Sequence, residues 1–260
     1  MKLKIVFEDS EILIVDKPTG LVVNRSQTVK EEALQDLLSK YFNLESSLGI
    51  GNRAGIVHRL DRETSGLLTA AKTQKAFENL QNQFRERKVK KEYLCLAHGE
   101  INRDSGIIEG DVGRIGKFGK FGIVKKGRES KTEFKVIEKY EFKTKNFDEL
   151  LLEVHTKSRI NYLKKQAKKY TFLNLIPKTG RTHQIRVHIK SIGYPAVSDL
   201  IYTPKKLLRF DLIFCPRLFL HASKIKFSHP DSNKNVEFKS DMPNDLKDAL
   251  SYLTPLRIAD

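Results

Sequence analysis

A stretch from residue 58 to residue 68 brings together side chains that could do chemistry. It reads His-Arg-Leu-Asp-Arg-Glu-Thr-Ser-Gly-Leu-Leu, so Asp61 lies between Arg59 and Arg62. The flanking positive charges should keep the carboxylate of Asp61 ionised at neutral pH. An ionised carboxylate suits a nucleophile or a charge stabiliser better than a proton donor. The alternative is a surface Asp61 that simply pairs with a neighbouring arginine.

A second stretch, from Thr179 to His188, again places Arg, His and Gln ahead of apolar positions with helical spacing. His183 and His188 are five residues apart, which is not the i, i+4 spacing of a helical zinc site. No cysteine or carboxylate cluster accompanies them, and the chain has no phosphate-binding Gly-rich motif. We therefore expect neither a metal nor an organic cofactor.

Together the two stretches resemble the RluA family of RNA pseudouridine synthases, which isomerise uridine in RNA. Further segments that resemble the family occur in its order and cover most of the chain. They are an opening strand with a Lys-Pro turn at Glu11–Leu21, Gly55–Val57, Lys91–Ala97, Leu220–Ala222 and Phe227–Pro230.

The resemblance implies a role for several residues. Asp61 takes the position of the family's catalytic aspartate, and Arg186 that of the arginine which pairs with it. Tyr93 matches the tyrosine that stacks on the target base, although an aromatic residue in a strand can also be a core residue. Arg59 resembles the arginine that fills the space left when the base leaves its stack. Arg181 is an alternative partner of Asp61 and is expected to contact phosphate.

Charge supports an RNA partner. The chain has 48 Lys and Arg against 32 Asp and Glu, a net charge of +16, which favours a polyanion because phosphate contacts release counterions. Solubility alone is the alternative. His58 is expected to order the catalytic loop or to contact RNA. The full set of expected RNA-binding residues is His58, Arg59, Arg62, Lys164, Lys165, Lys168, Lys169, Arg181 and His183.

Two basic segments stand out. Residues 114–131 combine glycines and lysines with Phe118 and Phe121, which could stack on unpaired bases. The alternative is a solvated hairpin with both rings in the core. Residues 156–170 look like a basic insertion relative to the family, for which a solvated helix or loop face is the alternative.

The hydrophobic pattern predicts an α+β fold. Strands are expected at 5–7, 12–15, 67–71, 89–97, 132–137, 150–154, 171–176 and 217–227, and helices at about 29–42, from 74, at 185–192 and from 243. Without regular βαβ alternation, a mostly antiparallel sheet is expected. The resemblance implies the pseudouridine synthase fold: a bent mixed sheet with flanking helices and a central active-site cleft. We expect a single catalytic domain over residues 1–260, with no S4-type domain.

The remaining expectations concern compartment and class. Cys95 and Cys215 lack a Cys-x-x-Cys spacing and are expected to be buried free thiols. No signal pattern or membrane-length apolar run occurs, so we expect a cytoplasmic protein without a membrane partner. We also expect a monomer. The leading function is an RNA pseudouridine synthase acting on large-subunit ribosomal RNA, with transfer RNA second. A non-catalytic RNA-binding or ribosome-assembly factor is the alternative. A metal-dependent nuclease is not favoured, because the sequence lacks the cluster of carboxylates that such an enzyme needs to bind its metal ions.

Overall fold

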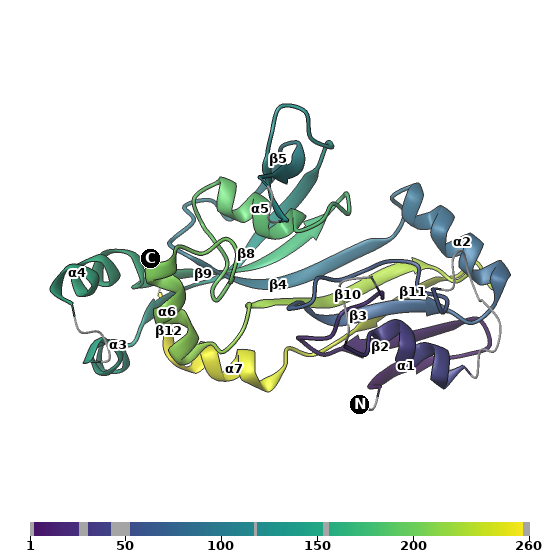
Figure 1. Ribbon diagram of the computed structural model, residues 1–260, viewed down its shortest axis with the longest axis horizontal. Helices are drawn as coiled ribbons and strands as arrows, with labels where there is room; N and C mark the ends of the chain where they lie inside the picture. The colour runs from purple at the N-terminus through teal and green to yellow at the C-terminus, as the bar shows by residue number, and fades with distance from the viewer. Residues whose placement is uncertain (1–2, 26–30, 43–52, 117–118, 153–155, 257–260) are drawn as a thin grey trace. The chain divides into compact units, whose positions relative to one another are not determined.

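The computed structural model describes residues 3–25, 31–42, 53–116, 119–152 and 156–256 (Figure 1). The chain divides into two compact units. Unit 1 comprises Met1–Glu92 and His221–Asp241, and unit 2 comprises Tyr93–Leu220 and Met242–Asp260. The single catalytic domain with a cleft and a basic insertion stays a prediction.

Unit 1 is built on a sheet with the strand order β1-β2-β3-β10-β11. Its strands are β1 (Ile5–Glu8), β2 (Ile12–Lys17), β3 (Ser65–Ala71), β10 (Leu220–Ser228) and β11 (Asn235–Lys239). All pairs are antiparallel except β3 with β10. The parallel pair approaches closely at Gly66, where a Cβ atom would lie 2.3 Å from the carbonyl oxygen of Ala222. Only glycine can therefore follow Ser65 at the start of β3.

Two helices complete unit 1. Helix α2 (Gln74–Arg85) begins where the hydroxyl of Thr73 accepts the Ala76 N–H at 3.1 Å, an N-cap bond. Its Phe77 and Leu80 are fully buried against residues of β2 and β3. Helix α1 (Leu34–Tyr41) is shorter than the predicted helix, and residues 29–30 lie outside the described ranges.

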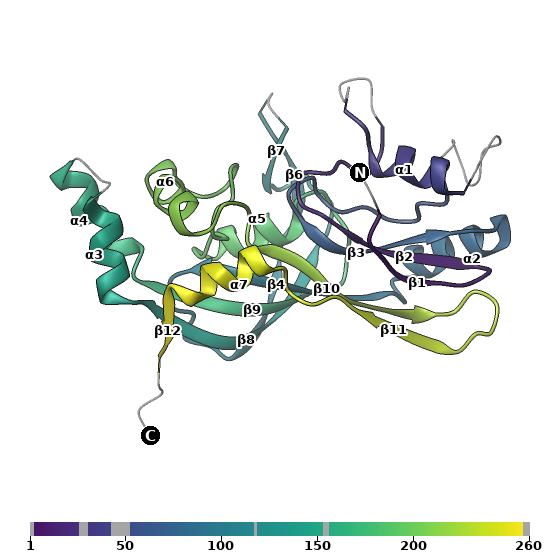
Figure 2. The same ribbon diagram turned by 90° about the horizontal axis from the view of Figure 1, so that it is seen from below.

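Unit 2 contains an antiparallel sheet with the order β4-β9-β8-β12, to which β5 adds beside β8. These strands are β4 (Lys90–His98), β5 (Ser105–Glu109), β8 (Lys131–Phe142), β9 (Lys169–Pro177) and β12 (Leu253–Pro255), and β6 (Val112–Ile115) pairs with β7 (Lys120–Ile123) as a separate hairpin. Figure 2 shows this hairpin extending from the unit.

Five helices belong to unit 2 among the described residues: α3 (Thr144–Leu152), α4 (Lys157–Gln166), α5 (Gln184–Ser191), α6 (Lys205–Phe214) and α7 (Asn244–Ser251). Residues of α3, α4, α6 and α7 share one core with β8 and β9. Aromatic rings dominate this core, including Phe142, Tyr170 and Phe214. The mostly antiparallel α+β prediction is confirmed.

The strand predicted at 150–154 is wrong, because residues 150–152 end helix α3 and 153–154 lie outside the described ranges. Phe147 and Leu151 are four residues apart and both are buried in the aromatic core. The apolar run therefore packs one face of a helix. Both cysteines are buried and free, as predicted.

Candidate active site

The first motif ends in a tight turn that carries Asp61. The Thr64 N–H donates to the Asp61 carbonyl oxygen at 3.2 Å, and strand β3 begins directly afterwards at Ser65. Asp61 is half-buried and Arg59 is exposed. No described residue bonds the guanidinium of Arg59, so this side chain can reach a partner such as RNA.

Lys17, the last residue of β2, holds this turn in place through hydrogen bonds. Its ammonium is buried, with 1% of the residue exposed, and donates to three main-chain carbonyls. These are the oxygens of Pro18 at 2.8 Å, Leu21 at 2.9 Å and Arg62 at 3.1 Å. An ammonium has three N–H donors, so each carbonyl receives one. Lys17 thus ties the Lys-Pro turn to the turn of Asp61.

Further bonds join the same two turns. The Thr19 hydroxyl donates to the Glu63 carbonyl at 2.8 Å, and the Gly20 N–H donates to the Arg62 carbonyl at 2.8 Å. Arg62 also donates through Nε to the Gly20 carbonyl at 3.1 Å and pairs with Glu31 at 2.8 Å. Arg62 therefore has a carboxylate partner within unit 1, and its predicted contact with RNA would compete with that pair.

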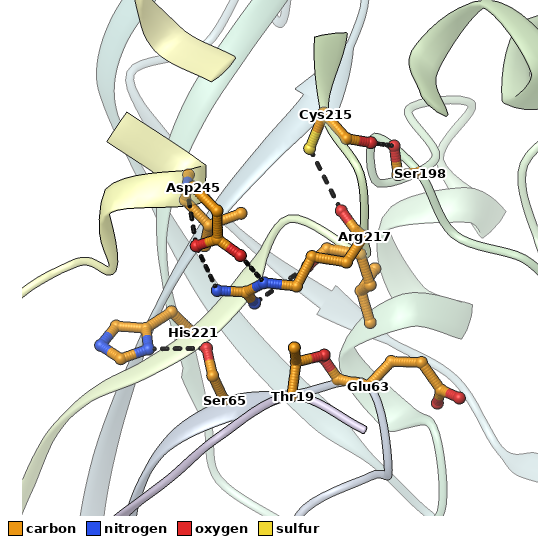
Figure 3. Close-up of polar contacts among 10 residues, drawn as sticks. Thr19, Glu63, Ser65, Ser198, Cys215, Arg217, His221 and Asp245 are labelled. Atoms are coloured by element: carbon orange, nitrogen blue, oxygen red, sulfur yellow. Dashed lines mark hydrogen bonds and ion pairs between the residues drawn. The ribbon is translucent and has the colours of Figure 1, made fainter. Parts of the chain in front are cut away.

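Figure 3 shows how β3 is fixed just after the turn. The Ser65 hydroxyl and His221 Nδ1 lie 2.9 Å apart, and His221 Nε2 lies 3.3 Å from the Ser240 carbonyl. A carbonyl can only accept, so a neutral His221 carries its proton on Nε2 and accepts from Ser65 at Nδ1. The bond anchors the end of the first motif on β10.

His58 is held by neutral contacts. The Thr69 N–H donates to its Nε2 at 2.9 Å, and its ring stacks on Phe84 with centroids 4.7 Å apart. Burial, aided by the charge of nearby Lys91, lowers the pKa of His58 to about 3. A neutral imidazole gives little attraction to phosphate. These contacts support the loop-ordering role that the sequence left open for His58.

The second motif is organised around Gln184, the first residue of α5. Its buried carboxamide oxygen accepts from the Thr179 hydroxyl at 2.6 Å and from the Arg181 N–H at 3.0 Å. Its Nε2 donates to the Lys131 carbonyl and to the Thr132 hydroxyl, both at 3.0 Å. Gln184 therefore fixes the loop of Arg181 against β8.

Arg186 lies two residues further along α5 and is buried, with 2% of the residue exposed. It forms a two-point ion pair with Asp199, from Nε to Oδ2 and from Nη2 to Oδ1, each 2.7 Å. Asp199 lies outside both motifs, and no pattern in the sequence marks it as a site residue. Tyr93 is also buried and pairs with Leu175 in the register of β4 and β9. The expected pairing of Arg186 with Asp61 stays a prediction.

The two histidines of the second motif have separate partners. His183 adopts a left-handed backbone with φ +55°, and its Nδ1 lies 2.9 Å from the Tyr202 hydroxyl. His188 is buried between the hydroxyls of Ser130 and Thr132, each 2.9 Å from a ring nitrogen. Within the described ranges, no group of three or more His, Cys, Asp or Glu could hold a metal ion.

The basic segments divide into exposed and anchored residues. Lys164, Lys165 and Lys168 are exposed, whereas the exposed Lys169 pairs with Glu100 at 2.7 Å. Phe121 is half-buried: its N–H donates to the Tyr202 hydroxyl at 3.1 Å and its ring packs on α5. Phe121 thus fits the alternative of a hairpin ring in a core. Phe118 lies outside the described residues.

Comparison with known proteins gives consistent results. A sequence profile of the RNA pseudouridylate synthase family matches residues 11–191. The chain is 34% identical over 258 residues to ribosomal large subunit pseudouridine synthase D of Nitrosomonas europaea, and covers 66% of that protein. It is 32% identical to the uncharacterized RNA pseudouridine synthase YlyB of Bacillus subtilis, covering 97% of this chain and 73% of that one.

A solved structure agrees with these relatives. Human RNA pseudouridylate synthase domain containing 1 superposes with a TM-score of 0.70 at 26% identity, covering all of this chain and 91% of the other. Among the described residues, no helix has the length and apolar character needed to span a membrane. Since the profile spans more than half of the sequence, the chain belongs to the RNA pseudouridylate synthase family, a family of isomerases.

Proposed function

We propose that the protein isomerises specific uridines to pseudouridine in structured RNA, and that its substrate is large-subunit ribosomal RNA. The observation that carries the proposal is the His-Arg-Leu-Asp motif, whose turn is held in place by buried Lys17. The name of the Nitrosomonas europaea relative supports the choice of RNA. Positive charge supports binding of a polyanion.

The reaction breaks the bond between C1′ and N1, turns the base and joins C1′ to C5. The base must first leave its stack, which costs a few kcal/mol and is easiest in loops and bulges. Asp61 supplies the carboxylate at the sugar or base edge. Arg59, exposed next to it, fills the space that the base leaves.

Tyr93 and Arg186 complete the proposed catalytic set. The ring of Tyr93 provides the surface on which the freed uracil stacks. Arg186 pairs with Asp61 and keeps that carboxylate ionised and oriented. Arg181, half-buried at the start of the second motif, contacts phosphate together with exposed lysines.

Substrate and product contain the same atoms, so the isomerisation consumes no ATP and needs no external electron donor or acceptor. We propose that the enzyme works as a monomer without metal or organic cofactor. Turnover should therefore survive dialysis against a chelator, and a reversible loss of turnover on removal of metal would contradict this.

The decisive experiment treats bulk RNA from a strain lacking the gene with the purified protein, and maps pseudouridine by carbodiimide reactivity. The expected result is modification at defined uridines of large-subunit ribosomal RNA by the natural protein and none by Asp61→Asn. Modification of transfer RNA instead would show that transfer RNA, and not ribosomal RNA, is the substrate. RNA binding without any modification would favour the non-catalytic assembly factor.

A further inference from the structure

Asp199 is a fully buried carboxylate that bonds Arg186 through both of its oxygens. Both of its oxygens bond the guanidinium at 2.7 Å, and neither residue exposes more than 2% of its side chain. Two main-chain donors also reach Oδ1, the N–H groups of Ile201 at 2.9 Å and Tyr202 at 3.1 Å. Because the backbone fixes the carboxylate, the carboxylate can fix the arginine.

The ring of Tyr202 restricts the movement of the Arg186 guanidinium on a second side. The guanidinium carbon of Arg186 lies 5.2 Å from the centre of the Tyr202 ring, within the range of a cation–π contact. The hydroxyl of that ring is itself held by His183 at 2.9 Å and by the Phe121 N–H at 3.1 Å. The carboxylate and the ring together restrict rotation of the guanidinium.

The geometry also orients the remaining donors of the arginine. A guanidinium has five N–H groups, and the ion pair with Asp199 uses one on Nε and one on Nη2. The group is planar, so pinning one edge sets the direction of the opposite edge. That opposite edge, carrying Nη1, is the one which a second carboxylate would meet.

We propose that Asp199 is a positioning residue for the isomerisation, acting through Arg186. This inference rests on the proposed function, in which Arg186 pairs with the catalytic carboxylate. Asp199 touches neither substrate nor reacting atoms in this proposal. Its loss should slow the chemical step because a displacement of about 1 Å in a catalytic group can cost about 10²-fold in rate.

The chain offers a matched control in Asp211. This aspartate is also fully buried in unit 2, and it bonds His98 at 2.9 Å and the Ser198 N–H at 3.0 Å. Ser198 is the chain neighbour of Asp199, so both carboxylates secure the same loop. Among the described residues, Asp211 bonds His98 and Ser198 and forms no ion pair with Arg186. A purely structural role would give both aspartates the same phenotype.

The test compares Asp199→Asn with Asp211→Asn on the target RNA. We expect Asp199→Asn to lower the single-turnover rate by about 10²-fold with the Kd for RNA nearly unchanged. Asp211→Asn should lower the unfolding temperature at least as much while keeping the rate. Equal rate losses in the two variants, or a normal rate in Asp199→Asn, would overturn the inference. If the natural protein forms no pseudouridine, the proposed function itself fails.

A rescue experiment covers the case in which Asp199→Asn does not fold. Ethylguanidinium added to Arg186→Ala should restore part of the turnover, because Asp199 still offers a carboxylate to bind it. The same addition should not restore turnover to the double variant Arg186→Ala/Asp199→Asn, which lacks the unpaired buried charge of the single variant. Equal rescue of both proteins would show that Asp199 does not position the cation.

Discussion

The two motif regions fix their charged groups by different means. In unit 1 the turn of Asp61 is held through its main chain, with Lys17 and Thr19 bonded to carbonyl oxygens. In unit 2 Arg186 is held through its own guanidinium by Asp199. The first arrangement orients a whole turn, and the second orients one functional group.

This difference predicts how many groups a substitution in each region should disturb. Removing Lys17 would take one hydrogen-bond donor from each of three carbonyls, those of Pro18, Leu21 and Arg62, and loosen both turns at once. Removing Asp199 would disturb one side chain, while the helix that carries Arg186 keeps its own hydrogen bonds. We therefore expect losses of stability to dominate in the first region and losses of rate to dominate in the second.

The largest expected effect tests whether the two regions act together. Asp61→Asn and Arg186→Ala should each lower the single-turnover rate by roughly 10³-fold or more, and the double variant should lose little beyond either one. Arg186→Lys should also be poor, since lysine lacks the planar two-donor edge. Single-turnover kinetics on the same RNA gives all four rates. Fully additive losses would separate the regions and make Arg181 the next candidate partner of Asp61.

The second prediction concerns the main-chain clamp. Lys17→Met keeps most of the side-chain volume but removes the ammonium, so the carbonyls of Pro18 and Leu21 lose this donor, while the carbonyl of Arg62 keeps the Gly20 N–H. Since each unsatisfied buried group costs about 1–3 kcal/mol, we expect the free energy of unfolding to fall by about 3 kcal/mol. Urea unfolding measures the change, and turnover at saturating RNA should fall with it.

Lys88→Met is the matched control for this clamp. Lys88 lies in the same unit, and its exposed ammonium pairs with the exposed carboxylate of Glu86 at 2.6 Å. A pair between two exposed side chains contributes little to stability, so Lys88→Met should change little. Similar losses in both variants would show that the carbonyl clamp has no special part in holding the turn.

The sequence predicted the helices and strands of both regions better than the hydrogen bonds and ion pairs that hold the candidate residues in place. Strands β2 and β3 and helix α5 follow from apolar runs and helical spacing, and the candidate residues follow from the two motifs. The acceptors of Lys17 are main-chain carbonyls, which leave no trace in residue types. Asp199 lies in a short loop without periodicity, thirteen residues from its partner Arg186. The neutral state of His58 depends on Phe84, which only the fold brings near.

The third prediction tests whether the stability of the first region depends on an uncharged His58. Burial lowers the pKa of His58 to about 3, while the unfolded chain titrates near 6.5. Between these values the unfolded chain binds a proton that the folded protein does not, so stability should fall as the pH falls from 6.5 toward 3. His58→Phe keeps a ring on Phe84 and removes this contribution. Urea unfolding of both proteins across that range should give a steeper fall for the natural protein, and parallel curves would contradict the prediction.

The smallest effect is expected for exposed lysines whose ammonium groups are held neither by hydrogen bonds to main-chain carbonyls nor by an ion pair among the described residues. Lys164, Lys165 and Lys168 are exposed and no described residue pairs with them, whereas Lys169 pairs with Glu100. An unpaired lysine can give its full charge to a phosphate, but the carboxylate beside Lys169 already offsets its charge.

Replacing those three lysines with glutamine should therefore flatten the salt dependence of RNA binding, and Lys169→Gln should do so less than any one of them. Each phosphate that loses its lysine partner lowers the slope of log K against log salt by about 0.7–0.9. Turnover at saturating RNA should stay nearly normal in both variants, since these lysines lie outside the two motifs. A salt titration that gives the triple variant an unchanged slope would assign residues 156–170 to a solvated surface. A larger change for Lys169→Gln would mean that Glu100 yields its partner to RNA, so that an ion pair in this enzyme can be exchanged for a phosphate contact.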